Sequence, residues 1–183
     1  MTKSISDESA VSLESSLQSF FYSQLMEFNK KTLSPLPNEA IYYSSLVMDK
    51  YGCSGELFET SEGKVREKVL GVKLLESCNL SARERSRQLK DIGDTALIVC
   101  GFFSESLNKK IVDPKYYQEL GQIAYRQLNS VMPTAYDVPS FFDVLSTNFD
   151  KITNVMSLVS EKSFNRDWDS ESVYLFVSKK LVG

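Results

Sequence analysis

Histidine is missing entirely from the 183 residues of this chain. Its absence removes the side chain that most often acts as a general base near neutral pH or activates a nucleophile. It also excludes most sites for transition metals, for which imidazole is the commonest ligand. Catalysis would have to rely on carboxylates, lysine, tyrosine, cysteine or a Mg²⁺ ion. We therefore expect no catalytic residue, no metal site and no cofactor.

Cysteine is also scarce, and its three copies, Cys53, Cys78 and Cys100, form no CxxC pair. An odd number of scattered thiols is ordinary in a reducing compartment and does not suit a closed zinc site. No basic N-terminal region followed by an apolar stretch marks an export signal. The longest apolar run is far shorter than the roughly 18–20 residues that a membrane span requires. These absences predict a cytoplasmic protein without a membrane span.

Glycine and proline, with 8 and 5 copies, punctuate the chain too rarely for a fold of many short strands. The content of 42% hydrophobic and 25% charged residues is typical of a globular protein. The sequence shows no repeat and no domain boundary. We predict an all-α fold: a single domain over residues 1–183, with 1–7 frayed, forming a bundle of six or seven helices.

The centre of this bundle is predicted to be a buried helix over about 82–108. Ser81 and Glu84 have the spacing of a capping box, a specific start signal. Residues 96–103 then form a run of eight residues without a charge, which predicts that other helices surround this part of the helix. Asp113-Pro114 gives a second start signal, for an antiparallel neighbour over about 114–131.

Apolar residues at helical spacing predict the remaining elements. The segment 170–181 is rich in β-branched and aromatic residues, so both a helix and a strand stay open there. Residues 52–61 are expected to form a loop. The other predicted helices cover about 8–29, 38–51, 62–77 and a range that starts at Asp137 or Ser140 and ends at about 161.

Asp94 lies where the basic and apolar faces of the central helix meet. A carboxylate at such a boundary needs a partner, because burying an unpaired charge is costly. One interpretation pairs it with Lys90 or Arg87, or with a tyrosine of the following helix. The other places it in a pocket, where it could take part in ligand binding. The candidate site for a small anionic ligand consists of Arg83, Arg87, Lys90, Asp94, Tyr117 and Tyr125.

Aromatic residues supply the candidate contacts with a partner protein. Phe102 projects away from the main apolar face, so either another helix covers it or it belongs to an exposed patch. Trp168 stands between two aspartates and is either a lid or an interface anchor. In the doublets Tyr42–Tyr43 and Tyr116–Tyr117, one ring should face the core while the other reaches an edge, because neighbours on a helix point about 100° apart.

The leading functional hypothesis is a non-catalytic cytosolic adaptor or regulator that binds another protein, with a homodimer as one form. The alternative is a sensor of a nucleotide or phosphate-like anion at the basic stripe beside Asp94. An enzyme using Asp94 with a tyrosine ranks third. Nucleic acid is not favoured, because the net charge is −3 and no recognition motif is present.

Overall fold

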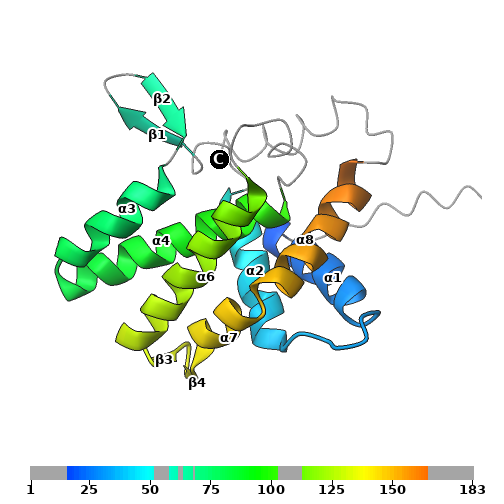
Figure 1. Ribbon diagram of the computed structural model, residues 1–183. Helices are drawn as coiled ribbons and strands as arrows, with labels where there is room; N and C mark the ends of the chain where they lie inside the picture. The colour runs from blue at the N-terminus through cyan, green and yellow to red at the C-terminus, as the bar shows by residue number, and fades with distance from the viewer. Residues whose placement is uncertain (1–15, 52–57, 62–63, 68, 103–112, 165–183) are drawn as a thin grey trace, which may run out of the picture.

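The computed structural model describes residues 16–51, 58–61, 64–67, 69–102 and 113–164. Within them, seven α-helices pack together, and two short β-hairpins accompany them (Figure 1). The chain is therefore an all-α bundle, as predicted. The elements are α1 (Leu17–Asn29), α2 (Asn38–Tyr51), β1 (Phe58–Ser61), β2 (Lys64–Glu67), α3 (Leu70–Glu76), the 3₁₀ helix η2 (Ser77–Asn79), α4 (Ala82–Gly101), α6 (Pro114–Val131), β3 (Thr134–Ala135), β4 (Val138–Pro139), α7 (Phe141–Thr147) and α8 (Phe149–Phe164).

The central helix α4 begins where its capping signal predicts. The hydroxyl of Ser81 accepts a hydrogen bond from the backbone N–H of Glu84, whose carboxylate accepts one from the Ser81 N–H. The helix ends earlier than predicted, at Gly101, with Phe102 as its C-cap. Glycine has the poorest helix propensity after proline, which suits its place as the last helical residue. The remainder of the predicted helix, 103–108, lies outside the described residues.

The uncharged run on α4 is largely buried. Ala96, Leu97 and Ile98 are at most 1% exposed, and Gly101 is buried too. Helix α6 packs along α4, and α2, α3 and α8 also contact it. The neighbouring helices do not cover the run completely, however. Val99, Cys100 and Phe102, near its C-terminal end, are only half-buried. The prediction of a helix embedded in the bundle is confirmed in its main part.

Two glycines allow α4 and α6 to approach closely. A Cβ on Gly121 of α6 would lie 2.5 Å from the ring of Phe149 and 2.9 Å from the Cβ of Ala96. On α4, a Cβ on Gly93 would lie 2.5 Å from the ring of Tyr125. Both sites lie in helix interiors, where glycine costs about 1 kcal/mol relative to alanine. The missing side chains make room for aromatic rings.

The helix predicted over 62–77 is wrong in its first half. Strands β1 and β2 pair antiparallel, with Phe58 opposite Glu67 and Ser61 opposite Lys64, and the described α-helical part of this range is α3. Two residues, one of them a glycine, separate Ser61 from Lys64 in the sequence, and this is typical of the connection in a β-hairpin. The predicted loop over 52–61 likewise contains β1. Figure 1 shows this hairpin next to the N-terminal end of α3.

The helix predicted over 140–161 is two helices. Helix α7 ends at Thr147, and the side-chain amide of its C-cap Asn148 donates to the Val144 carbonyl. Such local bonds from an asparagine compete with the helical backbone pattern, which explains the break before α8.

Helix α1 is capped by Ser16, whose hydroxyl accepts from the Ser19 N–H; residues 1–15 lie outside the described part. In the part of the chain that the structure describes, no helix combines the length and apolarity needed to cross a membrane.

Candidate functional site

Asp94 is a buried carboxylate, 1% exposed, that accepts three hydrogen bonds. Its Oδ1 accepts from the hydroxyls of Tyr43 on α2, at 2.5 Å, and Tyr125 on α6, at 2.9 Å. Its Oδ2 accepts from the ammonium of Lys90, one turn back on α4, at 2.8 Å. Of the two interpretations of Asp94, the structure shows the paired one, and both predicted kinds of partner are present. The carboxylate joins three helices.

The two tyrosines of this cluster stay protonated. The pKa values of Tyr43 and Tyr125 lie well above the ordinary value, mainly because both side chains are buried. The negative charge of Asp94 raises both pKa values further. A hydroxyl that keeps its proton is a steady donor to a carboxylate. This arrangement suits a structural centre, because neither tyrosine supplies a phenolate for catalysis.

Tyr43 connects this buried cluster to an open groove on the surface. The groove has a volume of about 370 Å³. It lies where α1, α2, the β3–β4 hairpin and the start of α7 meet, and Tyr43, only 2% exposed, forms its floor. Asp94 is not among the lining residues, and the hydroxyl of Tyr43 links it to the groove. The lining residues are Tyr22, Asn38, Glu39, Tyr42, Tyr43, Leu46, Tyr136, Val138 and Phe141.

Aromatic rings make up most of the groove wall. Tyr42 and Tyr136 are 51% and 58% exposed, so both rings offer uncovered surface. Tyr136 packs edge to face on Tyr43 and Phe141, with ring centroids 5.8 and 5.2 Å apart, and Tyr22 meets Tyr42 in the same way at 6.0 Å. Contacts of this type hold each ring by its neighbours, so the wall is preformed.

The turn that carries Tyr136 has a strained backbone. Tyr136 and Asp137, which link β3 to β4, have φ angles of 54° and 59°, and Ser140 has one of 55°. A tight hairpin turn needs residues with positive φ at both of its central positions, where glycine, asparagine and aspartate are the usual choices. A tyrosine there is uncommon and costs roughly 1–3 kcal/mol. Strain of this kind is concentrated at functional sites, which here singles out the rim of the groove.

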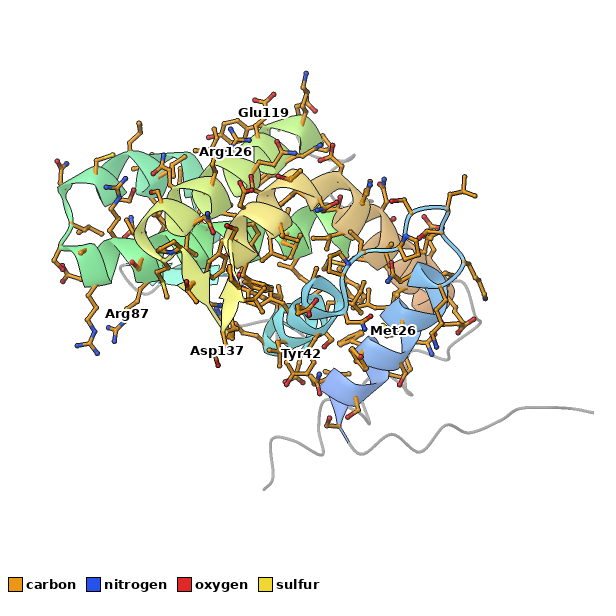
Figure 2. All side chains as sticks on the ribbon, turned by 90° about the horizontal axis from the view of Figure 1, so that it is seen from below. Met26, Tyr42, Arg87, Glu119, Arg126 and Asp137 are labelled. Atoms are coloured by element: carbon orange, nitrogen blue, oxygen red, sulfur yellow. The ribbon has the colours of Figure 1, made fainter. Side chains whose placement is uncertain are left out.

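The predicted anion site is assembled only in part. Lys90, Asp94 and Tyr125 come together, but Asp94 offsets the charge of Lys90, and the ring of Tyr125 is fully buried. Arg83 and Arg87 are exposed on α4, and Figure 2 shows Arg87 extending away from the ribbon. Tyr117 is 8% exposed, with its ring against that of Tyr116. Of the six residues of the predicted site, Arg83 and Arg87 are exposed cations, whereas Lys90, whose side chain is 39% exposed, is paired with Asp94.

Of the two predicted partner contacts, one is covered by the chain itself. Phe102 is half-buried, and its ring meets that of Phe21 on α1 edge to face, with centroids 5.8 Å apart. Its carbonyl accepts a hydrogen bond from the hydroxyl of Ser160 on α8. Trp168 lies outside the described residues.

The groove itself was not predicted, although one signal pointed toward it. The doublet expectation is confirmed, because Tyr43 and Tyr117 are buried, at 2% and 8% exposed, while Tyr42 and Tyr116 are 51% and 44% exposed. The doublet on α2 thus marks both the floor and the wall of the groove. Nothing local in the sequence indicates that Tyr136 joins them.

Within the described residues, no group of three or more acidic or cysteine side chains is placed to hold a metal ion. Comparison of the chain with protein-family models, with curated proteins and with solved structures gives no match.

Proposed function

We propose that this protein is a non-catalytic cytosolic adaptor that holds a segment of a partner protein in the groove. The observation that carries the proposal is the preformed aromatic wall, in which Tyr42 and Tyr136 leave about half of their surface uncovered. Tyrosine is enriched among the residues that dominate binding at protein interfaces, because it combines a large apolar ring with a hydroxyl. A groove of this volume accommodates a few residues of a bound chain.

The chemistry of the lining supports binding over catalysis. Apart from the tyrosine hydroxyls, its polar groups are the amide of Asn38 and the carboxylate of Glu39. The lining holds no lysine, no cysteine and no second carboxylate beside Glu39, which favours binding over acid–base catalysis by paired groups. Nor does the lining include a cation, so it does not suit the small anion of the alternative hypothesis.

The test is a selection of random peptides displayed on phage, performed against the full chain. We expect recovered peptides to bind the Tyr42→Ala variant about tenfold more weakly than the unmodified protein, since Tyr42 supplies a central ring of the wall. The matched control is Tyr116→Ala, which removes a tyrosine of similar exposure, 44%, from α6. This control should bind the same peptides with unchanged affinity.

Two results would contradict the proposal. One is a selection that enriches no peptide. The other is a set of peptides whose affinity is the same for the unmodified protein and for Tyr42→Ala, which would place their binding elsewhere on the molecule.

A further inference from the structure

We propose that the segment held by the groove is proline-rich, adopts the polyproline II conformation and carries an arginine or lysine that pairs with Glu39. This inference rests on the proposed function and specifies the partner's chemistry. The modes of peptide recognition that need neither a cluster of arginines nor a chain terminus are strand addition to a sheet edge, docking of an amphipathic helix, and binding of a polyproline II segment to aromatic rings. The structure distinguishes among them.

Strand addition does not fit this groove. The hairpin at its rim has strands of only two residues each, and one of them contains Pro139, which has no N–H to donate. An added strand would find too few free backbone groups to bond. Hydrogen bonding along a sheet edge therefore cannot supply the affinity.

A helical occupant fits less well than a polyproline II segment. A docked helix places anchors at positions i, i+4 and i+7, which spans roughly 10 Å, and needs a row of apolar pockets. Here tyrosines dominate the lining, and only Leu46 and Val138 are aliphatic. Rings set edge to face, such as Tyr22 with Tyr42 at 75°, present angled surfaces to the flat side chain of proline. A polyproline II chain has no internal hydrogen bonds and needs few from its receptor.

The charge of the groove indicates the second feature of the segment. Glu39 is the one charged residue among the nine that line it, and it is exposed in the first turn of α2. Asp137, next to Tyr136 in the turn, adds a second negative charge on the same side of the molecule as Tyr42, as Figure 2 shows. Both carboxylates complement a cation. An arginine or lysine beside the prolines satisfies this charge, and the rings favour it further through cation–π contact.

The probe is a fluorescein-labelled decaproline peptide with an arginine at one end, titrated against the full chain and followed by fluorescence anisotropy. We expect saturable binding, about tenfold weaker for Tyr42→Ala. Replacing the arginine of the peptide by glutamate should weaken its binding to the unmodified protein. This loss should be larger than the loss that Glu39→Gln causes for the arginine peptide. Glu39→Gln should lower the affinity for the arginine peptide about two- to fivefold, the scale of an exposed ion pair.

The matched control is Glu119→Gln, which removes an exposed carboxylate from α6, on the opposite side of the molecule in Figure 2. It should leave the affinity unchanged. The inference is overturned if the arginine peptide does not bind, or if Glu39→Gln binds it as well as the unmodified protein does. It is also overturned, with the proposed function intact, if the peptides selected by display need Tyr42 but contain neither prolines nor a basic residue.

Discussion

Replacing Asp94 by alanine should lower the free energy of unfolding by about 2–5 kcal/mol. The substitution leaves the buried hydroxyls of Tyr43 and Tyr125 without their acceptor, and each such loss costs roughly 1–3 kcal/mol. Lys90 loses its ion pair as well, but its side chain is 39% exposed and can turn to solvent. Most of the loss therefore comes from the two tyrosines.

Urea denaturation followed by far-UV circular dichroism measures this loss as a lower midpoint with an unchanged slope. Asp143→Ala is the matched control, because Asp143 is an exposed aspartate in the first turn of α7 and should change stability by at most about 1 kcal/mol. A loss for Asp94→Ala no larger than that of the control would show that the buried cluster does not stabilise the bundle.

Replacing Leu97 by alanine should also cost about 2–5 kcal/mol. Leu97 lies in the uncharged run of α4, is 0% exposed and belongs to the main hydrophobic core. Truncation removes buried methyl groups and leaves a cavity that rigid neighbouring helices fill only in part. The loss tests whether α4 is embedded in the bundle.

Leu75→Ala is the control for this experiment, since Leu75 on α3 is 76% exposed. It should change the free energy of unfolding by no more than about 0.5 kcal/mol. Both variants are compared by urea denaturation under the same conditions. Equal effects for Leu97 and Leu75 would contradict the burial of the central helix.

The parts of the fold that the sequence predicts well are those with local signals. The capping box at Ser81 and the Asp113-Pro114 pair set the starts of α4 and α6, because caps are formed by residues within one turn of each other. The two kinds of partner that Asp94 has, a lysine and a tyrosine, could likewise be predicted from nearby positions in the sequence. Lys90 is one turn away, and Tyr125 lies on α6, the helix predicted as the antiparallel neighbour of α4.

The errors have a different origin. Valines at 65, 69 and 72 fit both a helical spacing and a strand, so apolar periodicity alone did not separate β2 from α3. The groove depends on α1, α2, α7 and a hairpin meeting at one place, which no local pattern encodes. Its strained turn also has a tyrosine at the first of the two positions that usually carry glycine, asparagine or aspartate.

Hydrogen–deuterium exchange of the full chain, with and without a peptide from the display selection, tests the groove most directly. Our account predicts slower exchange on binding at the first turns of α2 and around the β3–β4 turn, where Tyr42 and Tyr136 meet the occupant. Protection confined to residues 83–90 would instead place the ligand on the basic stripe of α4. That result would contradict the account.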